Sequence, residues 1–350
     1  MNLYVHFPFC RAKCAYCALH SRAGSTPSAR AEHGARIARE LAQRKLSPLD
    51  TVYFGGGSPA LCDLSPLAPK LAEDAEFTVE LHPLDATSAK LDELRRLGVN
   101  RISLGVQSFD DAALVAMGRG HSAAEAEAAF RRVRAVFPNS GLDLIAGWPG
   151  TDEASWRTTL DRALALAPVH VSCYSLIREP KTRLDLEVRK GRVTLPDDDA
   201  ALAQVDQACA ALSTAGFRRY EVSNYALPGH ECRHNCAVWR GEDYIGLGEG
   251  AHGREGRVRT VGEIAGYARS EVSEMEDALE RALLGLRTAD GIDLNLVARR
   301  WPTLVPRLPA WRETLAALVA SGILVEPSPG VFAPTARGFE VCDAVMAELL

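Results

Sequence analysis

Three cysteines near the amino terminus constrain this chain more than any other feature. They are Cys10, Cys14 and Cys17, in the stretch Cys-Arg-Ala-Lys-Cys-Ala-Tyr-Cys. Intervals of four and three residues allow one short loop to direct three thiolates at a common centre, as ligation of an iron–sulfur cluster requires. Three protein ligands leave one iron of a four-iron cluster open, and an open coordination position lets a metal centre bind a small molecule.

A structural zinc site is the main alternative, because the three cysteines together with His6 or His20 would supply four ligands. A disulfide framework is disfavoured. The chain has nine cysteines, an odd number, and its first residues do not form a charged and then apolar signal segment. We therefore expect a reducing, cytoplasmic location.

Composition is that of a globular protein with a large core, since 47% of the 350 residues are hydrophobic. No apolar run is long enough to span a bilayer, so we expect no integral membrane segment. The formal net charge is -5 with acids and bases interspersed, and no basic stripe is present. We therefore expect no nucleic-acid partner.

Residues 1 to about 180 alternate β-branched or aromatic runs with amphipathic stretches, which predicts strands that alternate with helices. Strands are predicted at 3–6, 51–54, 77–81, 101–105, 142–146 and 169–176. Helices are predicted at 29–46, 88–97, 123–136 and 154–166. Six such units form a parallel sheet with right-handed crossovers, and a complete eight-unit barrel would need about 250 residues. The sequence therefore predicts an α/β fold, a partial, open barrel with its ligands at the carboxyl ends of the strands.

Polar and glycine residues follow several of these strands. Gly55-Gly56-Gly57-Ser58 comes directly after the second strand, where glycines allow the backbone to approach a ligand closely. Glu80, Gln107 and Asp143 interrupt or end otherwise apolar strands, which is costly unless each side chain is paired or binds something. Arg119 follows a short predicted helix and could pair with a carboxylate. Each could also be a satisfied structural group.

The cysteine loop and these segments resemble the oxygen-independent coproporphyrinogen oxidase superfamily of radical S-adenosylmethionine proteins. The resemblance rests on the cysteine stretch and on Asn100–Asp110, Gly118–Ser122 and Asp143–Gly150. It implies a four-iron cluster held by the three cysteines, with the open iron chelating the methionine part of S-adenosylmethionine and Tyr16 against that cofactor. The other residues that it implies around S-adenosylmethionine are Tyr4, Gly56, Gly57, Ser58, Glu80, Gln107, Arg119 and Asp143. Two positions differ from the common pattern, Ser58 in place of threonine and His82 in place of asparagine.

A second group of histidine and cysteine lies at Cys232-Arg-His234-Asn-Cys236-Ala-Val238-Trp239. Read as a strand, the segment would place the two cysteines and the histidine on one face, where they could form a second metal site. The resemblance implies another use. In the superfamily, a His-Asn-x-x-Tyr-Trp segment here marks the heme chaperone branch, HemW, and the present segment matches it except at Val238. A neutral imidazole is a good axial ligand for heme iron, so His234 is a candidate heme ligand.

The chain is expected to divide into three parts. Residues 1–180 would form the radical S-adenosylmethionine barrel, 181–274 an extension with the heme-motif-like segment, and 275–350 a small cap. Helix patterns at 276–286, 294–301, 309–321 and 336–350, with strand signals near 323–325 and 331–332, predict a winged-helix-like α+β cap. The resemblance assigns that cap to the carboxy-terminal domain of the same superfamily.

Two functions of different class remain open. One is heme delivery, in which the protein binds heme and hands it to heme-accepting apoproteins. The other is oxidative decarboxylation of coproporphyrinogen III, or radical chemistry on another tetrapyrrole. The true oxidases have a fourth cysteine two positions after the third and an extra amino-terminal arm, whereas this chain has Leu19 there and starts close to the loop. The heme chaperone function is therefore favoured.

Overall fold

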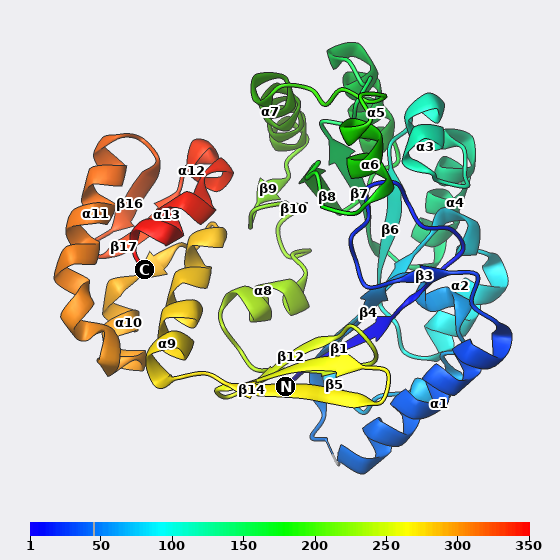
Figure 1. The fold of residues 1–350 in the computed structure, drawn as a ribbon, viewed down its shortest axis with the longest axis horizontal. Coiled ribbons are helices and arrows are strands. Elements are labelled where there is room, and N and C mark those ends of the chain that lie inside the picture. The colour runs from blue at the N-terminus through cyan, green and yellow to red at the C-terminus, as the bar shows by residue number, and fades with distance from the viewer. Residues whose placement is uncertain (45) are drawn as a thin grey trace.

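The computed structural model describes residues 1–44 and 46–350. Its largest element is a 12-stranded sheet with the order β14-β13-β12-β11-β1-β4-β5-β6-β7-β8-β10-β9 (Figure 1). The strands from β11 to β8 in that order pair in parallel. They are β11 (Tyr244–Leu247), β1 (Asn2–Phe7), β4 (Leu49–Gly56), β5 (Leu71–Leu81), β6 (Arg101–Gln107), β7 (Asn139–Ala146) and β8 (His170–Ser175). The predicted open parallel barrel is thus confirmed.

Antiparallel strands extend the sheet beyond both ends of its parallel part. They are β10 (Asn224–Ala226), β9 (Arg218–Arg219), β12 (His252–Glu255), β13 (Val258–Glu263) and β14 (Gly266–Glu271). All six predicted strands form. The sequence prediction missed β11. This strand has only four residues, and its second half overlaps the glycine-rich stretch that starts at Gly246. Its partner in the sheet is β1, more than 200 residues earlier in the chain.

Helices cover the outer face of the parallel strands (Figure 1). They are α1 (Pro27–Arg44), α2 (Ser88–Arg96), α3 (Asp111–Met117), α4 (Ala123–Val136), α5 (Glu153–Ala165) and α7 (Asp198–Thr214). The short helix α6 (Arg183–Arg189) packs instead against the cysteine loop, where Leu184 clusters with Ala15. Polar caps set several of the starts. Ser122, for example, precedes α4 in a capping box with Glu125, which satisfies amide groups that have no partner within the helix. Lys45, within the range predicted as helix 29–46, lies outside the described residues.

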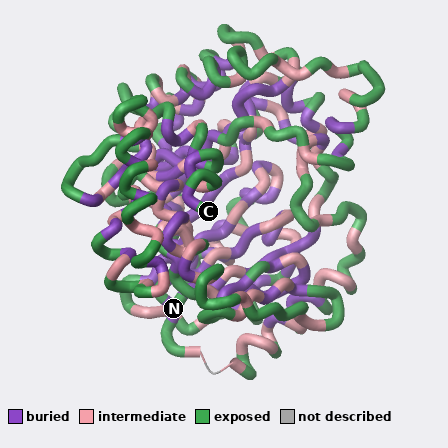
Figure 2. The backbone as a smooth tube through the Cα atoms, turned by 60° about the vertical axis from the view of Figure 1, so that its left-hand side comes forward, coloured by how far each residue is buried: buried purple, intermediate pink, exposed green. Residues whose placement is uncertain are grey.

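The period of two along each strand separates an apolar outer face from a polar inner face. In β1, Leu3, Val5 and Phe7 are fully buried in the core that the strands share with the helices. The alternate residues Asn2, Tyr4 and His6 make polar contacts inside the barrel instead. Buried backbone follows the strands along the length of the sheet (Figure 2). The interior of the barrel is therefore available for polar chemistry.

The carboxy-terminal part has its own hydrophobic core, formed between Ala278 and Leu349. Its elements are α9 (Glu274–Leu283), α10 (Leu294–Arg300), α11 (Leu308–Ala320), α12 (Ala336–Glu340), α13 (Cys342–Glu348), β15 (Ile292–Asp293), β16 (Leu324–Ser328) and β17 (Val331–Pro334). The helices with the antiparallel sheet β15-β17-β16 form the winged-helix-like α+β unit that was predicted. The prediction of one continuous helix over 336–350 was wrong, because Val341 leaves helical geometry between α12 and α13. The domain boundaries at 180 and 274 stay predictions.

Arginine–carboxylate contacts join this cap to the barrel. Asp277, near the start of α9, accepts hydrogen bonds from Arg254 of β12 and Arg259 of β13. Arg281, also on α9, donates to the carbonyl of Gly241 and to Asp243. The cap thus lies beside α8 (Arg233–Trp239) and the β12–β14 strands (Figure 1). In the described part of the chain, no helix has the length and apolar character needed to cross a membrane.

The strand predicted for Cys232, His234 and Cys236 was wrong, because residues 233–239 form the helix α8. The carboxylate of Glu76, on the buried inner face of β5, accepts hydrogen bonds from the amides of Arg233 at 3.0 Å and His234 at 3.1 Å. These are the first two amides of the helix. On a helix, residues two apart point to different sides, so the three side chains do not share a face.

Candidate functional site

The cysteine loop is closed at its base and fixed at its centre. The short strands β2 (Phe9–Cys10) and β3 (Arg22–Ala23) pair in parallel on either side of it. The amide of Ala15 donates to the carbonyl of Met117 at 2.8 Å, and the carbonyl of Ala15 accepts from Leu184 at 2.8 Å. Lys13 Nζ donates to the carbonyl of Leu19 at 2.6 Å, across the loop. The loop therefore has a defined shape without relying on a bound group.

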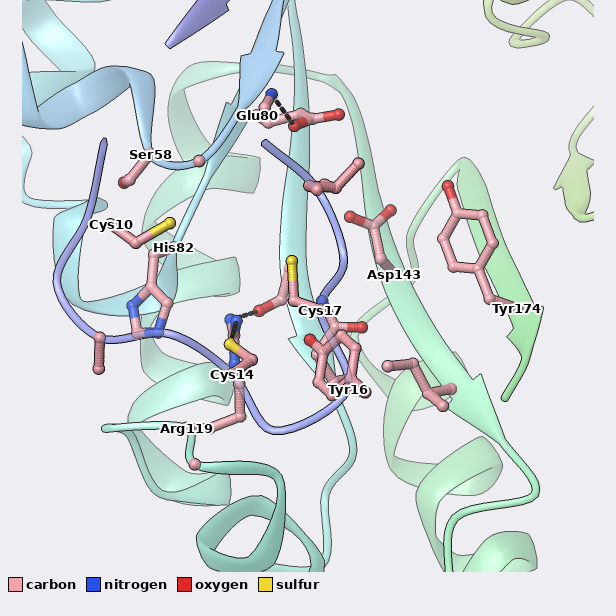
Figure 3. A pocket seen from close by; sticks show the side chains of 18 of the residues that line it. Cys10, Cys14, Tyr16, Cys17, Ser58, Glu80, His82, Arg119, Asp143 and Tyr174 are labelled. Carbon is pink, nitrogen blue, oxygen red and sulfur yellow. Dashed lines mark hydrogen bonds between the residues drawn. The ribbon is translucent and has the colours of Figure 1, made fainter. Parts of the chain in front are cut away.

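The three thiols of the loop suit an iron–sulfur cluster better than a single zinc ion. Cys10, Cys14 and Cys17 are free, partly buried, and all line one cavity (Figure 3). A zinc ion would draw its thiolates to within about 2.3 Å of one point, whereas each thiolate of a four-iron cluster binds a different iron. Among residues 1–44 and 46–350, no three His, Cys, Asp or Glu side chains are grouped to hold one metal ion.

Neither histidine of the zinc alternative is directed at the thiols. His6 Nδ1 lies 2.9 Å from Tyr4 Oη, and His6 Nε2 lies 2.7 Å from the carbonyl of His20. The His20 ring bonds to Glu249 at 2.7 Å. The described contacts of both rings therefore give no support to a four-ligand zinc site, and the same search finds none at Cys232, His234 and Cys236.

A cavity of about 600 Å³ opens beside the cysteine loop at the carboxyl ends of the strands. Every residue that the sequence analysis placed around S-adenosylmethionine lines it, although their binding roles stay predictions. These residues are Tyr4, Tyr16, Gly56, Gly57, Ser58, Glu80, Gln107, Arg119 and Asp143. The strand-end polar residues converge because neighbouring parallel strands end at the same edge of the sheet.

The turn after β4 brings backbone into close contact with the cysteine loop. The amide of Gly57 donates to the carbonyl of Phe7 at 2.7 Å, and a Cβ on Gly57 would lie only 2.4 Å from the carbonyl oxygen of Phe9. Gly56 has φ 104°, a conformation that side chains with a Cβ rarely adopt. Ser58 lines the cavity, yet its hydroxyl donates to Asp85 at 2.5 Å. The glycines are therefore required by packing, whatever ligand they face.

Glu80 and Asp143 form the acidic floor of the cavity. Glu80 accepts from the amide of Gly56 at 3.1 Å (Figure 3). It also accepts from the hydroxyl of Tyr53 at 2.7 Å. Burial, with the nearby charge of Asp143 adding to it, raises the pKa of Glu80 to about 7. Burial also raises the pKa of Asp143, although the carboxylate accepts a hydrogen bond from Ser103 at 2.8 Å. Two carboxyls with raised pKa values suit a cationic ligand group, which would favour their charged forms.

Gln107 and Arg119 lie on the side of the cavity near Cys14. Gln107 has φ 74° at an irregularity in the pairing of β6 with β7, and such backbone strain gathers at binding sites. Arg119 Nη1 lies 3.4 Å from Cys14 Sγ, and its Nη2 donates to the carbonyl of Gly105 (Figure 3). Within the described residues, the buried Nε of Arg119 has no hydrogen-bond partner. That free donor fits a carboxylate in the cavity.

His234 lies apart from the cavity, in the barrel interior near the amino ends of the strands. Its side chain is 4% exposed, its Nδ1 lies 2.8 Å from Thr51 Oγ1, and its ring centroid lies 5.3 Å from that of Tyr53. Burial, and then the charge of Arg101, lower its pKa to about 3. The imidazole is therefore neutral, as a heme ligand must be, but α8, to which His234 belongs, holds the ring buried against Thr51 and Tyr53.

Several cavity residues escaped the sequence analysis. Tyr174 extends from the end of β8 beside Asp143 (Figure 3). Arg11 and Ile177 also line the cavity. Tyr174 could have been found from the strand period. It lies two residues after Ser172 in a predicted strand, so the two polar side chains lie on the same face of that strand. Arg11 and Ile177 lie on loops, where no sequence period indicates direction.

Comparison with known proteins identifies the family to which this chain belongs. Residues 4–163 match the model of the radical SAM superfamily. The heme chaperone HemW of Mycobacterium tuberculosis is 35% identical over 100% of this chain and 94% of its own length. HemW of Bacillus subtilis is 31% identical over 99% of this chain and 100% of its own, and HemW of Synechocystis sp. is 36% identical over 83% and 78%. The chain belongs to the HemW family of radical SAM proteins.

Membership in this family implies a four-iron cluster and S-adenosylmethionine, the two groups expected from the cysteine loop. Among solved structures, coproporphyrinogen III oxidase (HemN) from Escherichia coli superposes with a TM-score of 0.83 over 99% of this chain and 89% of that one. The two sequences are 20% identical, so the likeness shows a shared fold. It includes both the open barrel and the cap.

Proposed function

We propose that this protein is a heme chaperone that binds a four-iron cluster, S-adenosylmethionine and heme, and transfers heme to acceptor proteins. The observation that carries the proposal is the similarity to HemW proteins across the whole chain. Leu19 supports it, because the oxidase branch would have cysteine there. A cavity lined by three free thiols and by polar strand ends is compatible with the first two groups.

We assign the cluster to Cys10, Cys14 and Cys17, and S-adenosylmethionine to the cavity beside them. The thiolates would hold three irons, and the bound cluster would supply one-electron reducing chemistry. The free Nε of Arg119 would bind the carboxylate of the methionine part. Glu80 and the backbone around Gly56 would receive its ammonium group.

His234 is the proposed axial ligand of heme, and its surroundings set a condition on that role. The ring can reach heme iron only if α8 moves away from Thr51 and from the carboxylate of Glu76. We infer that heme ligation by His234 would be accompanied by a displacement of α8.

The test is anaerobic reconstitution followed by separate assays for hemin binding and for coproporphyrinogen III consumption. We expect hemin binding and no protoporphyrinogen. His234→Ala should alter the Soret spectrum of the bound heme, whereas loss of a merely structural histidine would lower stability and leave that spectrum unchanged. Cys232→Ala and Cys236→Ala are matched controls, since thiolates also bind heme iron. Protoporphyrinogen formation with a reductant and S-adenosylmethionine would instead favour the oxidase.

A further inference from the structure

The cavity beside the cysteine loop has two chemically different parts. Its floor is polar, with the carboxyls of Glu80 and Asp143 and the backbone around Gly56. Its mouth is largely apolar, with Leu19 exposed by 56%, Ile177 by 67% and Tyr174, which lies beside Asp143, by 44%; Ser175 and Glu179 are the polar residues of that segment that also line the cavity. The floor has the chemistry of the proposed cofactor. The mouth therefore needs a different occupant.

The mouth gathers apolar side chains from separate segments. Leu19 follows the third cysteine, Tyr174 comes from the end of β8, and Ile177 comes from the loop after it. Leu84 and Leu176 also line this cavity. Large exposed hydrophobic residues are ordinary when scattered singly, but a group of them around a cavity indicates a binding surface for an apolar ligand. Exposing this group to water costs free energy that such a ligand would recover.

The rim of the mouth also offers positive charge. Arg11 lines the cavity with a side chain that is 51% exposed. Its Nε donates to Asp85 at 2.7 Å and its Nη2 also contacts that carboxylate, an ion pair that fixes the guanidinium in place and leaves the Nη1 N–H groups for a ligand. A guanidinium at the edge of an apolar surface suits a ligand that is flat and apolar across its face and carries carboxylates at its edge.

We propose that the mouth, formed by Leu19, Tyr174 and Ile177, binds one face of the heme macrocycle, with a propionate directed to Arg11. This inference rests on the proposed function and adds to it the surface that first receives heme. The mouth is accessible while α8 remains docked, whereas His234 is covered. Heme would thus contact the apolar mouth without any movement of α8.

The contact is with the porphyrin face and not with the metal, which separates it from ligation by His234. Metal-free protoporphyrin IX should therefore bind the mouth as well. We would titrate the anaerobically reconstituted protein with protoporphyrin IX and with hemin, and follow porphyrin fluorescence and Soret absorbance. The variants are Leu19→Asp and Ile177→Asp, which place a carboxylate against the porphyrin face. Ile264→Asp is the matched control, because Ile264 is 78% exposed and does not line the cavity.

We expect each mouth variant to weaken binding of both porphyrins by about tenfold or more, the factor that corresponds to 1.4 kcal/mol. Ile264→Asp and His234→Ala should leave the affinity for protoporphyrin IX unchanged. Retention of the iron–sulfur absorbance by each variant checks that the loop is intact.

The outcomes separate the two proposals. If the unmodified protein binds hemin and both mouth variants bind as tightly as it does, the mouth is not the porphyrin surface, and the proposed function stands. If the unmodified protein binds neither porphyrin, both proposals fail. If Ile264→Asp weakened porphyrin binding equally, the assignment of the porphyrin surface to the mouth would also be refuted, since the effect would then come from added charge anywhere on the surface.

Discussion

Removing the carboxylate of Glu76 should release α8. Glu76 is 5% exposed and accepts from the first two amides of the helix and, at 3.4 Å, from the thiol of Cys232. Cys232, at the N-cap position, makes no side-chain capping bond. Glu76, 156 positions earlier in the chain, caps the helix instead. In Glu76→Ala, both amides would lose their acceptor.

The magnitude follows from the number of bonds lost. A buried donor left without a partner costs about 1–3 kcal/mol, so two amides give a loss of about 2–6 kcal/mol. Total stabilities of about 5–15 kcal/mol make that a large change. Glu76→Gln keeps one acceptor oxygen and should lose about half as much. The loss should be local, because α8 is short and packs at the edge of the barrel interior.

Hydrogen exchange at residues 233–239 is the direct assay, with urea unfolding alongside it. Glu76→Ala should raise the exchange of this segment strongly and lower the urea midpoint. Glu73→Ala is the matched control, because Glu73 lies on the same strand and is exposed, so it should change stability by less than about 0.5 kcal/mol. Unchanged protection of 233–239 in Glu76→Ala would show that the helix does not depend on this cap.

Three further outcomes are expected. Alanine in place of the three loop cysteines should abolish the iron and sulfide content of anaerobically purified protein, and survival of a cluster in the triple variant would refute the assignment. Folded Glu80 has a pKa of about 7 against an ordinary value of 4.5, so the folded chain binds the proton more tightly. The free energy of unfolding of the protein should therefore fall as the pH rises from about 4.5 to 7. Urea titrations should show a smaller fall in Glu80→Gln. Asp277→Asn removes one of the two carboxylates that Arg254 and Arg259 contact, since Glu280 remains, and should lower the thermal midpoint and the exchange protection of α9. Equal midpoints would show that the cap docks without Asp277.

Much of the architecture could be predicted from sequence, because local periods carry it. β-branched and aromatic runs gave the six strands of the prediction, and the helices between them indicated a parallel sheet with right-handed crossovers. The polar residues Glu80, Gln107 and Asp143 could be assigned to one side of the barrel, since each interrupts or ends a strand of the same parallel sheet near its carboxyl end. This convergence needs only the topology.

The remainder depends on contacts that no local pattern reveals. The segment around His234 reads equally well as a strand until Glu76 is known to face its first amides. β11 is missed because its pairing with β1 is far along the chain. The burial of His234 behind Thr51 and Tyr53 follows from the same long-range packing. A motif can therefore identify a family without showing whether its residues are exposed or buried.

Because the barrel is open, its sheet has two outer edges, and each of them is a possible template for association with another chain. At one edge, β9 has only two residues, which offers little length for strand addition; Arg218 is exposed, and Arg219 is paired with Glu340 of the cap. At the other, Arg269 and Glu271 are exposed on β14. Charged residues on a short or exposed edge oppose pairing with a second copy. The same opening that admits a ligand thus creates an aggregation hazard, and the charges at β9 and β14 are placed where they limit it.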